Sequence, residues 1–225
     1  MNILSVTGPF YCYELSMDDI QGREVLGSVL KTTVRGSSSV VEGKMGDALS
    51  FDGRRTYVEG GDQSDTCLGD LEICQYGITV AMWIKFDNLE DATQVISSGN
   101  KGFRIYYRNG QLYGEVKQGD KSWKVGYGGL ETATWYYLEI TWEPSTGLKM
   151  FIDMKEVAGE ARFTTEAVQE GTSELYIGRD NTEMRSERYL AAAVDEVQMC
   201  YGDRKKLIDT GFIIRGMCHI FYTYL

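Results

Sequence analysis

The chain has 225 residues, a formal net charge of −10 and a single histidine, His219; 43% of its residues are hydrophobic and 25% are charged. This is the composition of a globular protein long enough to bury a full core, not of a disordered one. The acidic balance argues against nucleic-acid binding, which needs a basic surface. One histidine near the C-terminus argues against a His-based catalytic triad and against metal sites built on imidazoles.

Strand signals recur along the chain about every eight to twelve residues, with glycine-rich turns between them, which is typical of an antiparallel sandwich or barrel. The segment Gly36–Ser39 is expected to be a loop between strands. We expect a lead over residues 1–8, one domain over 9–202, and a short helical segment with a tail over 203–225.

A strand is predicted over Ile78–Phe86, which is rich in β-branched and aromatic residues with apolar side chains at alternate positions. A β-hairpin follows over residues 103–116, because Asn109 and Gly110 suit the two positive φ angles of a type I′ turn. Later strands are predicted at Trp123–Tyr127, Trp135–Trp142, Leu148–Asp153, Glu174–Gly178 and Val194–Met199. Helical periodicity is limited to Thr165–Gln169 and Asp203–Ile208.

Several segments, in the same order as in a known family, together resemble the laminin-G-like jelly roll of the concanavalin A-like lectin/glucanase superfamily. They are Val41–Gly53 with Tyr57 and Val58, then Ile78–Ile84, then Trp135–Leu138 with Leu148–Asp153, and finally Leu175–Gly178 with Val194–Val197. The resemblance implies an all-β fold, a two-sheet antiparallel jelly-roll sandwich, of the type found in extracellular animal proteins. It fades after about Gly216.

The chain departs from the family pattern at positions that bear on activity. Met154 stands where the family often has glycine, and Tyr137 stands where it has histidine. Glycoside hydrolases of the superfamily carry a Glu-x-Asp pair on one strand, but no Glu of this chain is followed by Asp two residues later. The paired carboxylates that glycosidic cleavage needs are therefore missing in that form, and we expect a protein that is not an enzyme.

The five cysteines bear on the compartment. Cys67 and Cys74 are seven residues apart, and Gly69-Asp70 between them can turn the chain, so the pair either forms a disulfide or stays as two free thiols. In the family's fold the first and last strands are neighbours, so Cys12 and Cys200 are a possible second pair, with buried free thiols as the alternative. Cys218 is left without a partner.

The ends of the chain give a conflicting indication of location. No apolar run reaches the roughly eighteen residues of a membrane span, and the N-terminus lacks the basic flank and apolar stretch of a signal peptide. A disulfide, however, implies an oxidising compartment. We therefore expect an extracellular or cell-surface ectodomain that is part of a longer protein.

Calcium is the cofactor that we expect, if there is any, because the family often holds Ca²⁺ at a sheet rim or between loops. Asp62 and Asp65 supply two carboxylates in one flexible loop, and Asp195 stands where the family places an aspartate close to the early loops. The predicted site is therefore Asp62, Asp65 and Asp195. The alternatives are that the loop is merely solvated and that Asp195 accepts hydrogen bonds from backbone amides.

Aromatic residues of neighbouring strands suggest a ligand surface, since exposed rings can stack on sugars. The predicted surface consists of Tyr106, Tyr113, Trp123 and Tyr127. The alternative is that these rings fill the core of the sandwich.

Together these features predict a non-enzymatic extracellular recognition or adhesion module that binds glycans or matrix and cell-surface proteins, with calcium as a possible aid. The alternatives are a structural spacer in a larger extracellular protein and, less favoured, a glycan-active hydrolase of the same superfamily.

Overall fold

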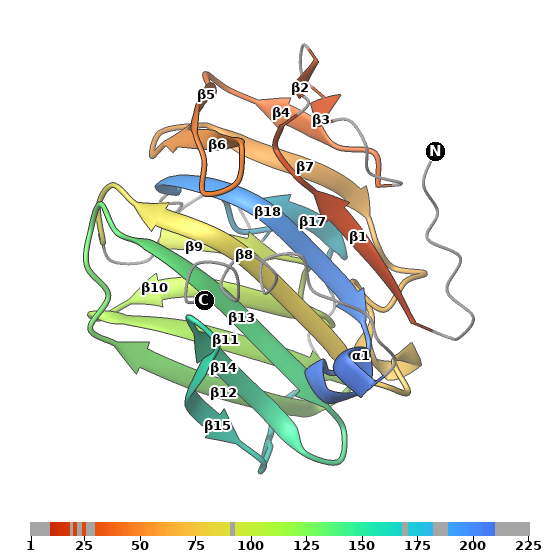
Figure 1. Ribbon diagram of the computed structural model, residues 1–225. Helices are drawn as coiled ribbons and strands as arrows, with labels where there is room; N and C mark the ends of the chain where they lie inside the picture. Colours follow the sequence, from red (N-terminus) through yellow and green to blue (C-terminus); the bar gives the residue numbers. More distant parts are fainter. Residues whose placement is uncertain are drawn as a thin grey trace.

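The protein is described here by a computed structural model that covers residues 10–18, 20–21, 24–25, 30–90, 93–167, 171–181 and 189–209. Apart from turns and loops, these residues form antiparallel β-strands, a short 3-10 helix, η1 (Leu71–Ile73), and one described α-helix, α1 (Arg204–Asp209). In Figure 1 the strands form two layers, with α1 beside the end of β18.

The first layer, the β8 sheet, has the strand order β15-β14-β13-β8-β18-β6-β5, and β1 also pairs with β18. The strands are β15 (Lys155–Glu160), β14 (Gly147–Ile152), β13 (Trp135–Glu143), β8 (Ile78–Phe86), β18 (Ala191–Tyr201), β6 (Asp47–Asp52), β5 (Ser39–Glu42) and β1 (Tyr11–Leu15).

The second layer, the β10 sheet, has the order β16-β12-β11-β10-β9-β17-β7-β4, and β2 and β3 form a separate ribbon. The strands are β16 (Thr164–Thr165), β12 (Lys121–Gly128), β11 (Gln111–Gln118), β10 (Phe103–Arg108), β9 (Thr93–Ser97), β17 (Glu174–Ile177), β7 (Tyr57–Asp62), β4 (Thr33–Arg35), β2 (Ile20–Gln21) and β3 (Glu24–Val25).

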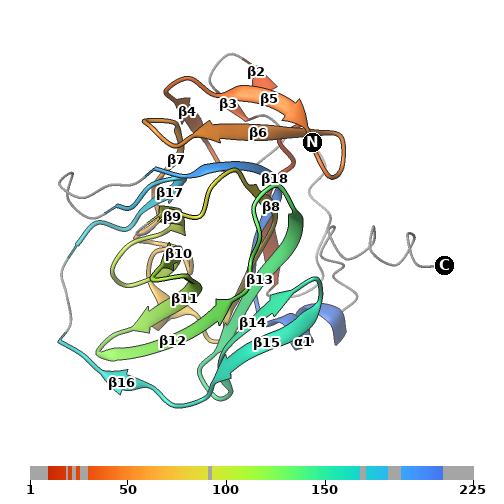
Figure 2. The same cartoon turned by 90° about the vertical axis from the view of Figure 1, so that its left-hand side faces the viewer.

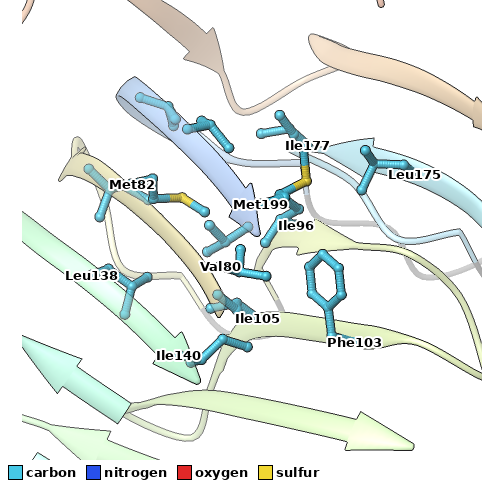
Figure 3. Packing of buried hydrophobic residues seen from close by; sticks show 14 of the residues in the cluster. Val80, Met82, Ile96, Phe103, Ile105, Leu138, Ile140, Leu175, Ile177 and Met199 are labelled. Atoms are coloured by element: carbon cyan, nitrogen blue, oxygen red, sulfur yellow. The ribbon is translucent and has the colours of Figure 1, made fainter. Parts of the chain in front are cut away.

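The two sheets pack face to face, as the side view in Figure 2 shows. Figure 3 shows Val80 and Leu138 of the β8 sheet in one apolar cluster with Ile105 and Phe103 of the β10 sheet, and all four are almost completely buried. Successive side chains of a strand point to opposite faces, so burying one face of each sheet leaves the alternate residues on the outside. The outer faces are therefore determined by the core.

The predicted all-β, two-sheet antiparallel sandwich is confirmed. The strand expected over Ile78–Phe86 has the same bounds as β8, and the expected hairpin joins β10 to β11. Its turn residues Asn109 and Gly110 have φ angles of 50° and 77°, as a type I′ turn requires.

The helix expected over Thr165–Gln169 is wrong where the structure describes that segment. Thr164 and Thr165 form the strand β16 and pair with Ser122 and Lys121 of β12. The physical reason is that β-branched threonines suit an extended strand, and the edge of β12 offers them free backbone hydrogen-bonding groups. The rest of the expected helix, from residue 168, lies outside the described residues.

The described part of the chain contains two disulfides. Cys12 and Cys200 are opposite each other in the β1–β18 pair, with their Cα atoms 4.0 Å apart across 188 residues of sequence. Cys67 and Cys74 enclose η1, with their Cα atoms 5.2 Å apart. Cys218 and His219 lie outside the described residues, as do the lead of residues 1–8 and the tail from residue 210.

The helix expected over Asp203–Ile208 is found as α1, and it is fixed to the outside of the β8 sheet. The amide of Arg204 donates to Thr141 Oγ1 at 2.8 Å, and its guanidinium pairs with the fully buried Glu139 at 2.9 Å. Burial raises the pKa of Glu139 to about 7, although Arg204 opposes that shift. In the described part of the chain no helix is long and apolar enough to cross a membrane.

Candidate functional site

The candidate site is the outer face of the β10 sheet. In β10 the side chains of Phe103, Ile105 and Tyr107 enter the core, so Arg104 and Tyr106 face outward. The same alternation brings three further tyrosines to the outside. We call the resulting surface the tyrosine face, and it comprises Tyr57, Tyr106, Tyr113 and Tyr176.

The first tyrosine pair joins β10 to β11. Tyr106 is directly opposite Tyr113, and the two rings stack with their centroids 5.4 Å apart. Lys124 of β12 lies over both rings, its Nζ 4.3 Å from the centroid of Tyr113 and 5.4 Å from that of Tyr106. The Tyr113 ring covers Gly126, where a Cβ atom would come within 2.8 Å of it. Glycine at this position therefore lets the tyrosine lie flat on the sheet.

An ion pair with a buried carboxylate lies beside this tyrosine pair. Arg104 Nη2 is 2.8 Å from Glu115 Oε1, and the Tyr106 hydroxyl donates to Glu115 Oε2 at 3.2 Å. Burial acts to raise the pKa of Glu115, but the hydrogen bond and charge of Arg104, together with the charges of Lys117 and Lys124, outweigh it and hold that pKa below its usual value. Burial and the nearby Glu115 also raise the pKa of Tyr106, so it stays a neutral hydroxyl.

The second tyrosine pair joins β7 to β17. The rings of Tyr57 and Tyr176 meet edge to face at 5.8 Å, and Tyr189 stacks against Tyr57 at 6.2 Å. The Arg179 guanidinium lies 4.4 Å from the Tyr176 centroid and 4.9 Å from that of Tyr57. The Tyr176 hydroxyl donates to Glu174, which together with burial raises the pKa of Tyr176.

Strand β9 separates the two tyrosine pairs and supplies polar groups between them. Its Gln94 is opposite Tyr106, and its Ser97 is opposite both Arg104 and Tyr176. The side-chain oxygen of Gln94 is buried and has no hydrogen-bond partner among the described residues. Adjacent strands are about 4.8 Å apart, so the two pairs are close enough for one oligosaccharide to touch both.

Two residues of the predicted ligand surface do not belong to it. Trp123 is 2% exposed and its ring meets that of Trp142 in the core, while Tyr127 packs partly buried against the same core. The physical reason is the alternation along β12, since Lys124 and Gly126 face outward and the residues on either side of them must face inward. Tyr106 and Tyr113 are on the outside together, whereas Trp123 and Tyr127 are core residues.

Asp195 lies on the opposite side of the molecule, on the outer face of the β8 sheet. Its Oδ2 accepts hydrogen bonds from the amides of Lys44 and Met45, both at 2.9 Å. The alternative prediction for this residue, that it accepts backbone amides of an early loop, is therefore confirmed. Burial raises its pKa to about 6, although the amides of Met45 and Lys44 oppose the shift.

The structure does not bring Asp62 and Asp65 to Asp195. Asp62 ends β7 in the β10 sheet and accepts hydrogen bonds from the amide and hydroxyl of Ser64. Asp195 belongs to the β8 sheet, opposite Trp83, and faces away from the other layer. Among the described residues, no group of three or more His, Cys, Asp or Glu side chains is arranged to hold a metal ion.

Asp18 is the carboxylate that the sequence analysis missed near Asp195. Its Oδ1 accepts the amide of Asp47 at 2.8 Å, and its charge adds to the raised pKa of Asp195. The other oxygen of Asp195, Oδ1, is buried and has no hydrogen-bond partner in the part of the chain that the structure describes. A buried carboxylate oxygen beside a second carboxylate suits a hard cation such as Ca²⁺. No local motif marks Asp18, because its neighbour in the fold is 177 positions away.

A model of the concanavalin A-like lectin/glucanases superfamily matches residues 59–203 of the chain. No curated protein matches it in sequence. Among solved structures it is similar to domain 4 of an extracellular arabinanase from Geobacillus stearothermophilus in complex with arabinotriose. The identity is 16% and the TM-score is 0.56, over 85% of this chain and 92% of that one.

Two further solved structures belong to larger proteins. One is botulinum neurotoxin type C, whose cell entry depends on two ganglioside molecules; the identity is 12% and the TM-score 0.60, over 89% of this chain and 50% of that one. The other is Trypanosoma rangeli sialidase in complex with sialic acid, with 18% identity and a TM-score of 0.61 over 91% and 33% of the two chains. At these identities the likeness extends to the fold alone.

We predict that Glu115→Gln lowers the free energy of unfolding by about 1–3 kcal/mol at pH 7, since it leaves Arg104 without its anionic partner. Because the pKa of Glu115 is lowered in the fold, its stabilising effect is present above the usual carboxylate pKa and is lost as the pH falls through the lowered value. The difference between variant and parent should therefore shrink from pH 7 towards pH 3 in denaturant unfolding.

The matched control is Glu156→Gln, whose ion pair with Lys149 is exposed, at 46% and 42% of the two side chains. It should cost only a few tenths of a kcal/mol. Equal losses for the two variants, or a Glu115→Gln loss that does not change with pH, would contradict this role of Glu115.

Proposed function

The chain belongs to the concanavalin A-like lectin/glucanase superfamily, and from that premise we propose that it is a non-enzymatic recognition module that binds glycans on the tyrosine face. The partner that we propose is an extracellular or cell-surface protein that carries such glycans. The family alone does not decide this, because one fold hosts many functions. The groups that meet on the tyrosine face favour glycan binding among those functions.

The observation that carries the proposal is the combination of rings and paired polar groups on one sheet surface. Sugars offer hydroxyl groups that both donate and accept, and ring faces that pack on aromatic side chains. Tyr113 supplies a half-buried ring that stacks on the more deeply buried Tyr106, and the Arg104–Glu115 pair supplies a donor and an acceptor.

The similar structures support a glycan ligand without identifying it. The arabinanase domain is in complex with arabinotriose, the neurotoxin depends on two ganglioside molecules, and the sialidase is in complex with sialic acid. For this chain such ligands are part of the proposal.

The carboxylate on the tyrosine face supports binding without cleavage. A glycosidase needs a general acid that is still protonated near neutral pH, which requires a raised pKa. Glu115 has a lowered pKa and is paired with Arg104. It is therefore suited to hold an arginine and accept hydrogen bonds, and not to donate a proton to a leaving group.

The two disulfides support an extracellular or cell-surface location, since such bonds persist mainly in oxidising compartments. We propose this location together with the binding function.

We also propose that calcium, if the protein uses it, binds at Asp195 and Asp18 and not at Asp62 and Asp65. The specific observation is Asp195 Oδ1, which is buried without a partner close to the charge of Asp18. When bound there, Ca²⁺ would neutralise the two carboxylates and fix the loop that contains Lys44 and Met45. Its role would be to stabilise the fold, because the tyrosine face is on the other sheet.

We predict that Tyr113→Ala weakens binding to a glycan selected on a glycan array by about fivefold, since one stacked ring contributes on the order of 1 kcal/mol. The matched control is Tyr11→Ala, which removes a 40% exposed tyrosine from the β8 sheet. Isothermal titration with the selected glycan measures both. Equal affinity of Tyr113→Ala and the parent, or no response to any glycan, would contradict the proposal.

We predict that millimolar Ca²⁺ raises the melting temperature of the parent chain and that Asp195→Asn abolishes this rise. Asp62→Asn is the control and should keep it, because Asp62 accepts hydrogen bonds within its own loop. Differential scanning calorimetry with Ca²⁺ and with chelator gives the answer. No effect of Ca²⁺ on the parent, or loss of the effect in Asp62→Asn, would refute the Asp195 site.

A further inference from the structure

The two sheets differ strongly in charge, although the chain as a whole is acidic. The strands of the β8 sheet carry three cations and ten carboxylates, namely Lys85, Lys149 and Lys155 against Glu14, Glu42, Asp47, Asp52, Glu139, Glu143, Glu156, Glu160, Asp195 and Glu196. The strands of the β10 sheet carry six cations and four carboxylates, namely Arg35, Arg104, Arg108, Lys117, Lys121 and Lys124 against Glu59, Asp62, Glu115 and Glu174. By this count the strands that carry the tyrosine face have a net charge of +2 (6 − 4), against −7 (3 − 10) for the strands of the β8 sheet.

The cations of the tyrosine face are held on the tyrosine rings. Lys124 is exposed and lies over Tyr113 and Tyr106. It is directly opposite Glu115 and its charge acts on that carboxylate, but among the described residues no carboxylate is within ion-pair distance of it. Arg104 lies 5.5 Å from the Tyr106 centroid, and Arg179 lies over Tyr57 and Tyr176. A cation over an aromatic ring is attracted by the negative face of the ring, so these side chains are kept at the surface in defined places.

This arrangement affects which sugars can bind. Lys124 occupies the approach to the Tyr113 ring, so a neutral sugar that stacks there must first displace it. An anionic group can instead pair with Lys124 where it lies and gain a charge-assisted hydrogen bond. The neighbouring Arg104 is 30% exposed at its side chain and is already oriented by Glu115, so it can donate to the same group or to an adjacent hydroxyl.

We propose that the glycan bound on the tyrosine face is acidic, and that Lys124 is the residue that recognises its carboxylate or sulfate group. This inference rests on the proposed glycan-binding function and adds the chemical class of the ligand. The net charge of the chain is −10, so its overall field disfavours an anion and a local cation is needed to hold one.

The test compares acidic glycans with their neutral counterparts. The probes are 3′-sialyllactose with lactose for a carboxylate, and a heparin tetrasaccharide with its fully desulfated form for a sulfate. Each is titrated into the full chain at low and at high salt, alongside Lys124→Gln, which removes the charge of an exposed side chain. The matched control is Lys155→Gln, an exposed lysine of the β8 sheet.

At least one acidic probe should bind tenfold or more tightly than its neutral counterpart. Lys124→Gln should remove most of that preference and leave the melting temperature unchanged, while Lys155→Gln should behave as the parent. Binding should weaken with rising salt, because a partly exposed ion pair is screened. Whether the carboxylated or the sulfated probe responds identifies the anionic group.

The proposal is overturned if neutral and acidic members of both pairs bind equally, or if Lys124→Gln keeps the preference. If a glycan array finds neutral ligands that depend on Tyr113 and not on Lys124, the glycan-binding function stands and only the acidic class is wrong. If no glycan of either kind binds, both are wrong.

Discussion

Each sheet buries one face against the other, and because side chains alternate along a strand, that burial fixes the direction of every remaining side chain. In β12 the inward position of Trp123 against Trp142 requires Lys124 to face outward. The register of β11 with β12 then places Lys124 next to the outward side of Glu115, and the register of β10 with β11 places Tyr106 opposite Tyr113. A one-residue slip of β10 or β11 would turn its own tyrosine into the core, and a slip of β12 would turn Trp123 out of it.

The same constraint explains how the tyrosine face stays ordered without a core of its own. Its rings lie on neighbouring strands, its cations lie over the rings, and its buried carboxylate Glu115 fixes Arg104. Each contact satisfies a charge or a ring face that would otherwise be hydrated, so the surface is preorganised before a ligand arrives. The acidic β8 sheet differs in that burial raises the pKa values of its carboxylates Glu139 and Asp195. Arg204 opposes this shift at Glu139, and backbone amides oppose it at Asp195.

Part of this arrangement could be predicted from the sequence and part could not. The Asn109-Gly110 turn fixes the register of its hairpin, and that register makes Tyr106 and Tyr113 partners. Applying the same alternation to the strand that holds Trp123 and Tyr127 would have placed both on the face opposite Lys124. Whether that face is the core depends on how the strand pairs with its neighbour. The pairing of Tyr57 with Tyr176 and the approach of Asp18 to Asp195 join distant segments, and no local pattern encodes them.

We propose that ligands bind the outside of the β10 sheet. The most direct test is to titrate the ¹⁵N-labelled chain with the tightest acidic glycan found and to map the changes in the amide chemical shifts. The largest changes are predicted in β10, β11 and β12 around Tyr106, Tyr113 and Lys124, with smaller ones in β9 and β17. Changes confined to the loop of Lys44 and Met45 or to the outer face of the β8 sheet would contradict it.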